Sequence, residues 1–110
     1  MTDTRLPEQW LMNRDLDRLS DPAWRVLTRA MMYCNSQGTD GEIDRIYLRY
    51  IYPWGDPGQY LKEIVAIGWM VETESGYVIP DWESRGQSTA AQMAEYREKS
   101  RLKQKRYRTK

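Results

Sequence analysis

The segment SDPAWRVLTRAMMYCNSQG, residues 20–38, constrains the fold most, because it predicts an amphipathic helix with both of its ends marked. Ser20 or Asp21 can cap the helix, Pro22 suits its first turn, and Gly38 accepts the left-handed backbone that closes it. Apolar residues recur along one face at helical spacing: Trp24, Leu27, Ala30, Met31 and Cys34. By its length of 110 residues the chain is one domain, with a single modest core.

The remaining glycines and prolines divide the chain into short elements. Residues 6–19 predict a short strand or helix, and a turn at Thr39-Asp40-Gly41 precedes a very short strand at residues 42–43. A second helix is expected over residues 44–54, where Pro53 stops it. Its apolar positions are Ile46, Tyr47, Leu48, Tyr50 and Ile51.

A third helix and a hairpin complete this part of the chain. Asp56 and Pro57 open the helix and Gly68 ends it, with a buried face of Tyr60, Leu61, Ile64, Val65 and Ile67. Residues 69–82 then predict two strands with a turn at Glu74-Ser75-Gly76, and Val71, Tyr77 and Ile79 face the core. Helix, short strand, helix, helix, hairpin is the order of a winged helix-turn-helix.

Charge separates the chain into two parts. Residues 1–86 hold nine Lys and Arg against fourteen Asp and Glu, a net charge of −5, whereas residues 87–110 hold eight against two, a net charge of +6. The second part also predicts a long helix, capped by Ser88 or Thr89 and supported by a Glu95–Lys99 pair. We therefore expect a mainly α fold with a small β-hairpin: a winged-helix domain over residues 1–86 and a basic C-terminal helical extension over residues 87–110.

Several function classes find no support in the composition. The chain has no His and one Cys, which excludes an internal disulfide and a His/Cys metal site and leaves no usual set of acid, base and nucleophile. No glycine-rich phosphate loop is present, so we expect no enzyme and no cofactor. Without a signal peptide or a long apolar run, a cytoplasmic protein with no membrane partner is expected.

Five segments together resemble a known family. They are LSDPAWRVLTRAM (19–31), TDGEI (39–43), LKEIVAIGWMVET (61–73), GYVIPDW (76–82) and QSTAAQMAEYREKSRLKQKRYR (87–108). They are similar to the winged-helix domain that opens many replication-initiation-like and helix-turn-helix proteins of actinobacterial phages and prophages. The resemblance implies a DNA-binding role in phage replication initiation or transcription control, in the cytosol of the host cell.

The predicted hairpin is a poor partner for nucleic acid, since residues 69–83 contain four acidic residues and no Lys or Arg. We interpret it as a structural wing. The third helix presents Gln59 and Lys62 beside Glu63. Gln59 and Lys62 can read bases or contact phosphate, but an ordinary solvated polar face explains these residues as well. Two arginine pairs lie four residues apart and each can brace a phosphate or form ordinary salt-bridged surface: Arg25 with Arg29, and Arg45 with Arg49.

The strongest signal for nucleic acid is the tail RLKQKRYRTK, residues 101–110, where six of ten residues are cationic and none is anionic. About six neutralised phosphates give a log-log salt slope near −5. The candidate residues of this extension are Arg97, Arg101, Lys103, Lys105, Arg106, Tyr107, Arg108 and Lys110, with Tyr107 as a stacking side chain. Duplex DNA is the expected partner and single-stranded DNA an alternative.

Two other functions stay open. The acidic part could serve as an adaptor or inhibitor that binds a host or phage protein. Trp10, Trp54 and Trp82 are either exposed aromatic contacts for such a partner or core and flanking anchors. Alternatively, the basic tail could pack against the acidic part of its own or another subunit, which would give a homodimer.

Overall fold

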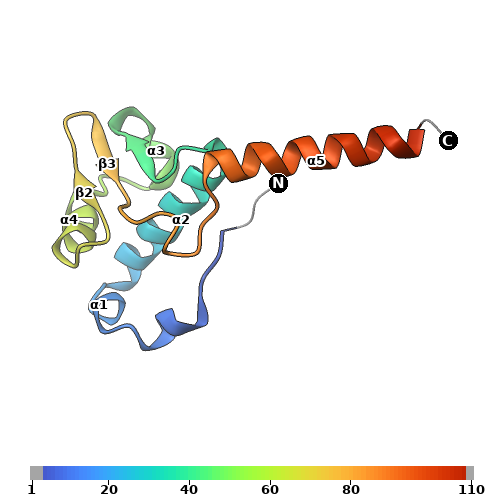
Figure 1. The fold of residues 1–110 in the computed structure, drawn as a ribbon. Helices are drawn as coiled ribbons and strands as arrows, with labels where there is room; N and C mark the ends of the chain where they lie inside the picture. The colour runs from blue at the N-terminus through green and yellow to red at the C-terminus, as the bar shows by residue number, and fades with distance from the viewer. Residues whose placement is uncertain (1–3, 109–110) are drawn as a thin grey trace.

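The computed structural model describes the backbone of residues 4–108 and the side chains of residues 4–102. The chain is mainly helical with one small three-stranded antiparallel sheet in the order β1-β3-β2. In Figure 1 the helix α2 runs through the middle of the body and α5 projects away from it. The elements are η1 Glu8–Met12, α1 Arg14–Asp17, α2 Asp21–Gln37, β1 Glu42–Asp44, η2 Arg45–Tyr47, α3 Leu48–Ile51, α4 Gly58–Ala66, β2 Val71–Glu72, β3 Gly76–Val78 and α5 Ala90–Arg108.

The helix α2 forms as its sequence predicts. The Ser20 hydroxyl oxygen accepts a hydrogen bond from the amide of Ala23 at 3.3 Å, and Gly38 closes the helix with φ at 64°. Its buried face packs mainly against α4. The core that results contains Leu27 and Met31 of α2 with Leu61 and Ile64 of α4, all of them buried.

The predicted hairpin and the short strand before it form one sheet. Strand β3 pairs with β2 on one side and with β1 on the other, and Ile43 lies opposite Tyr77. Gly76 makes the β1–β3 pair possible, because a Cβ at this position would lie 2.0 Å from the carbonyl oxygen of Ile43. The sheet therefore depends on a glycine at the turn into β3.

The second predicted helix is the main correction. It divides into the 3-10 turn η2 and the single α-turn α3, and of its five expected apolar positions only Ile51 is fully buried. The Asp44 carboxylate caps the 3-10 turn by accepting from the amide of Ile46. Because a 3-10 turn has three residues per turn rather than 3.6, the element does not keep the apolar stripe of one continuous α-helix. Ile46 in η2 and Tyr50 in α3 are both exposed.

Two smaller differences follow from short elements. Residues 6–19, expected as a strand or helix, form η1 and α1, and the Asn13 side chain caps α1 by accepting from the amides of Asp15 and Leu16. Val71 was expected in the core but is exposed, since β2 is the edge strand and its two residues both face solvent.

The long C-terminal helix is present as predicted. Its 19 residues give it a length of about 28 Å, and the whole molecule extends over 56 Å along its longest axis. Met93 in the first turn is buried, whereas every described side chain from Ala94 to Leu102 is exposed. The helix is thus held at its first turn and extends away from the body beyond it.

Candidate nucleic-acid interface

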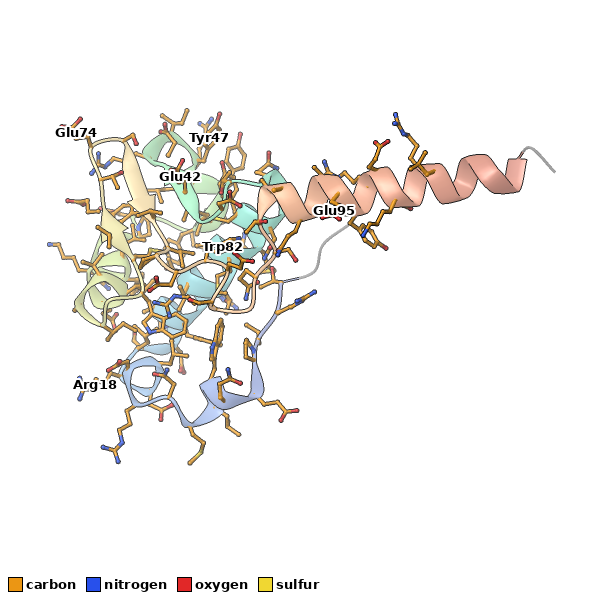
Figure 2. All side chains as sticks on the ribbon, in the orientation of Figure 1. Arg18, Glu42, Tyr47, Glu74, Trp82 and Glu95 are labelled. Carbon is orange, nitrogen blue, oxygen red and sulfur yellow. The ribbon has the colours of Figure 1, made fainter. Side chains whose placement is uncertain are left out.

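The start of α5 is fixed to the body by a set of polar contacts, which we call the root. The indole of Trp82 is buried and donates its Nε1 hydrogen to the carbonyl of Ser88 at 2.9 Å. The amide of Ala90 donates to the carboxylate of Asp40 at 2.6 Å, and the amide of Gln92 donates to the hydroxyl of Thr89. Figure 2 shows Trp82 within the body, next to the point where α5 begins. The direction in which α5 leaves the body is therefore specified by these contacts.

Gln87 is the centre of the root. Its side chain is buried and its Oε1 accepts from the amide of Arg5 and from Nδ2 of Asn35, both at 3.1 Å. Its Nε2 donates to the carbonyl oxygens of Arg5 at 2.7 Å and Arg85 at 3.2 Å. One amide thus joins the N-terminal segment, α2 and the loop before α5. The predicted boundary after Gly86 falls inside this network.

The exposed part of α5 carries residues of both charges. Glu95 pairs with Lys99 at 3.2 Å, as predicted, and Glu98 pairs with Arg101 at 2.6 Å. Both acidic residues of the extension are therefore engaged within the helix, and Arg97 makes no ion pair among the described side chains. The other predicted tail residues lie outside the described side chains: Lys103, Lys105, Arg106, Tyr107, Arg108 and Lys110.

The helix α4 presents a face with one cation. Gln59, Lys62 and Ala66 are exposed at spacings of three and four residues, which places them on one side of the helix. Glu63, expected beside them in solvent, instead accepts from the amide and the hydroxyl of Ser20 at 2.9 and 2.8 Å. The face that carries Gln59 and Lys62 is thus less acidic than the sequence suggested.

Arg45 and Arg49 do not form the shared phosphate clamp that their spacing suggested. Arg45 donates to the carbonyl oxygens of Glu74 at 2.6 Å and Thr73 at 3.2 Å, and its guanidinium lies 3.6 Å from a carboxylate oxygen of Glu72. It therefore holds the hairpin against η2. The guanidinium of Arg49 instead lies over the ring of Tyr50, at 5.3 Å from the centroid.

The second arginine pair does share a face, and both of its guanidinium groups lie near one aromatic ring. The guanidinium groups of Arg25 and Arg29 lie 5.0 and 4.9 Å from the centroid of the Trp54 ring. Of the three tryptophans considered for contacts, Trp54 is exposed, Trp82 is buried and Trp10 is partly buried against the edge of Trp69. The Arg25–Arg29 spacing is visible in the sequence, whereas the aromatic ring near both guanidinium groups is not.

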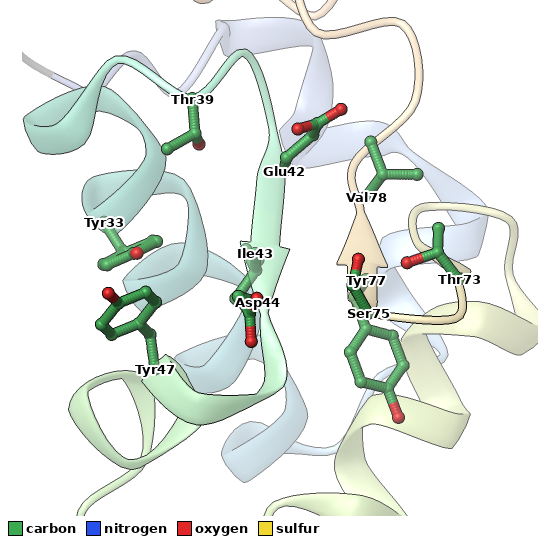
Figure 3. A pocket seen from close by; sticks show the side chains of 10 residues that line it. All are labelled: Tyr33, Thr39, Glu42, Ile43, Asp44, Tyr47, Thr73, Ser75, Tyr77 and Val78. Atoms are coloured by element: carbon green, nitrogen blue, oxygen red, sulfur yellow. The ribbon is translucent and has the colours of Figure 1, made fainter.

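The hairpin side of the molecule is acidic. Glu74 lies at the tip of the hairpin, as Figure 2 shows. A cleft of about 420 Å³ is lined by residues of α2, β1, η2 and the hairpin. Figure 3 shows Asp44 on the side of Tyr47, and Glu42 pointing toward Val78. The lining of the cleft contains no Lys or Arg, so this side disfavours phosphate.

The chemistry of the remaining groups is simple. Burial raises the pKa of the Cys34 thiol to about 11, so the thiol is protonated near neutral pH. Among the described residues no cluster of three or more His, Cys, Asp or Glu side chains could hold a metal ion. No helix within the same residues combines the length and the apolar content needed to cross a bilayer.

No protein-family model matches the chain, and no curated protein or solved structure is significantly similar to it. We therefore infer function from the geometry and charge of the described residues.

Proposed function

We propose that the chain is a small phage-type DNA-binding protein, active in replication initiation or transcription control. In this proposal α5 supplies the attraction to phosphate and the body orients the molecule on the duplex. One observation carries the proposal: α5 is fixed at its root, yet every described side chain beyond its first turn is exposed. The extension to which α5 belongs, residues 87–110, has a net charge of +6.

The distribution of side chains on α5 favours a polyanion over a protein groove. Among its described side chains Tyr96 and Leu102 are large, apolar and exposed, and the six positions between them place them about 120° apart around the helix. A helix that docks into a protein groove needs its apolar residues on one side. DNA requires only cations along the helix, and the major groove is wide enough to admit one.

The body supports a winged-helix role. The order α2, β1, α3, α4, β2, β3 and the sheet order β1-β3-β2 are those expected of a winged helix-turn-helix. In that arrangement α4 occupies the position of the recognition helix, with Gln59 and Lys62 toward the bases. The acidic hairpin then acts as a structural wing that stays off the phosphates.

The test is a binding titration against a mixed-sequence DNA duplex of about 20 base pairs, at salt concentrations between about 50 and 200 mM. The full chain and a chain that ends at Ser100 are compared by fluorescence anisotropy. We expect the shorter chain to lose most of its affinity and most of its salt dependence. If it keeps the same affinity and the same slope, α5 does not have the role proposed for it.

A hollow near the N-terminal segment favours a second candidate function, an adaptor or inhibitor that binds a host or phage protein. The hollow has a volume of about 630 Å³, and its lining includes Trp10 and Leu11, the latter 80% exposed. Glu8, Asp17 and Asp21 contribute carboxylates to its lining. A host protein that stays bound to the wild-type chain after nuclease treatment, and is lost from Leu11→Asp, would favour this function.

A further inference from the structure

A second surface, away from α5, combines exposed aromatic rings with arginines. We call it the aromatic face and define it by six residues of α2, η2, α3 and the loop after α3: Arg25, Arg29, Tyr47, Arg49, Tyr50 and Trp54. None of its three arginines forms an ion pair with a carboxylate among the described residues. Its cations are therefore not neutralised by direct ion pairs.

The ring of Trp54 is held in a fixed orientation by its neighbours. Its side chain is 57% exposed although two guanidinium groups and the edge of Tyr52 already contact it. Arg29 is itself fixed, since it donates to the carbonyl oxygens of Ile51 and Tyr50 at the end of α3. The indole is thus held in one orientation while more than half of its surface stays in solvent.

The two tyrosines of the face form a second stacking element together with Tyr33. Tyr33, Tyr47 and Tyr50 follow one another with ring centroids 5.9 and 6.1 Å apart and interplanar angles of 31° and 34°. The outermost ring, Tyr50, is 58% exposed and has Arg49 beside it. Arg29 connects the two elements, because it contacts both the Trp54 ring and the backbone of Tyr50.

We propose that the aromatic face binds single-stranded nucleic acid, with bases stacked on Trp54 and Tyr50 and phosphates near Arg25 and Arg49. The inference rests on the proposed function and adds a second mode of binding to it. Every base has a π-face, so stacking on fixed aromatic rings needs no particular sequence. In a duplex the bases are already stacked on each other, so a surface of this kind selects unpaired strands.

The charge of the face favours a nucleic acid over a protein partner. Three arginines lie next to its rings, whereas the hollow of about 440 Å³ beside Trp54 has Asp21 as the one carboxylate in its lining. The acidic cleft of Glu42 and Asp44 lies beyond Tyr47, so a strand is expected to extend from Tyr50 toward Trp54 rather than toward the hairpin.

The test compares two probes with the full chain: a labelled oligothymidylate of about 12 nucleotides and an abasic oligonucleotide of the same length. Both carry the same phosphates, and only the first carries bases. We expect the wild-type protein to bind oligothymidylate about a hundredfold more tightly than the abasic probe, or about tenfold for each of the two rings. We also expect the bases to quench the fluorescence of Trp54, a signal that is absent in Trp54→Ala.

Substitutions then assign the effect to the face. The double variant Tyr50→Ala/Trp54→Ala should weaken binding to oligothymidylate about a hundredfold, about tenfold for each ring, and leave abasic binding unchanged. The variant Tyr50→Phe/Trp54→Phe keeps both rings and should retain most of the affinity. The matched control is Tyr96→Ala, which removes an equally exposed ring from α5, 62% exposed, and should change neither probe.

The outcomes separate this inference from the proposed function. Equal affinity for the two probes, or full oligothymidylate binding by the double alanine variant, overturns the stacking face and leaves a protein partner as the alternative for these rings. In both cases duplex binding that depends on residues 101–110 still supports the proposed function. Conversely, if the shorter chain binds duplex as well as the full chain but the double variant loses oligothymidylate, the proposed role of α5 fails and the stacking face stands.

Discussion

Replacing Gln87 with Leu should destabilise the protein by about 3 kcal/mol. The substitution keeps most of the side-chain volume and removes four hydrogen bonds, two accepted by Oε1 and two donated by Nε2. Each contributes about 1 kcal/mol, and the amide of Arg5 is left without its acceptor in a partly buried position. Asn35 still donates to the hydroxyl of Thr4, which reduces the loss.

Urea unfolding, followed by circular dichroism, measures this effect. With an m-value of about 1.5 kcal/mol/M, the midpoint of Gln87→Leu falls by about 2 M relative to wild type. Gln9→Leu is the matched control, because Gln9 is exposed on η1, and it should change stability by less than about 0.5 kcal/mol.

The result bears on function because Gln87 joins α2 to the loop that leads into α5. A loss of less than about 1 kcal/mol for Gln87→Leu, or an equal loss for Gln9→Leu, would refute the view that this buried amide holds the root together.

Three further predictions concern the body. Gly76→Ala should lower the free energy of unfolding by at least about 3 kcal/mol, because its Cβ would lie 2.0 Å from the Ile43 carbonyl oxygen. Gly58→Ala at the start of α4 is the control and should be near neutral. Similar melting temperatures for the two variants would contradict this. Ser20→Ala removes both the cap of α2 and a partner of Glu63 and should cost about 1–2 kcal/mol in urea unfolding, and no loss would argue against this cap. Because burial raises the pKa of Cys34 from its ordinary 9.0 to about 11, the folded protein holds this proton more tightly, so the associated stability is complete below pH 9 and is lost as the pH rises toward 11. Between pH 9 and 11, Cys34→Ala should lose less unfolding free energy than wild type. Its profile should still slope, since the pKa values of Tyr33, Tyr52 and Tyr77 are also raised, mainly by burial. Identical profiles for the two proteins would contradict the role given to the Cys34 thiol.

Elements with local signals at both ends were predictable from the sequence. For α2 the proline lies in the first turn, and the capping Ser20 and the closing Gly38 flank the helix directly. For α4, Gly68 follows the last turn with φ at 82°. The division of residues 44–54 was not predictable, because a single capping carboxylate and the packing of Ile51 decide between 3-10 and α geometry.

The polar contacts of the site depend on partners far away in the chain. Arg45 binds carbonyl oxygens 28 and 29 residues later, Glu63 reaches back 43 residues to Ser20, and Gln87 meets Asn35 across 52 residues. No local pattern contains such pairs. The sequence could therefore propose Arg45 as a phosphate ligand, and only the fold places it against the hairpin.

The proposal that α5 supplies the attraction to phosphate can be tested by removing its charges while keeping its length. The measurement is the salt dependence of duplex binding. Lys103→Gln, Lys105→Gln, Arg106→Gln and Arg108→Gln are combined in one chain and compared with wild type, whose log-log slope is expected near −5. If α5 supplies the attraction, the log-log salt slope of the variant becomes shallower by about 3.6, or about 0.9 for each charge removed. An unchanged slope and affinity would contradict it, because the attraction to DNA would then come from the body rather than from α5.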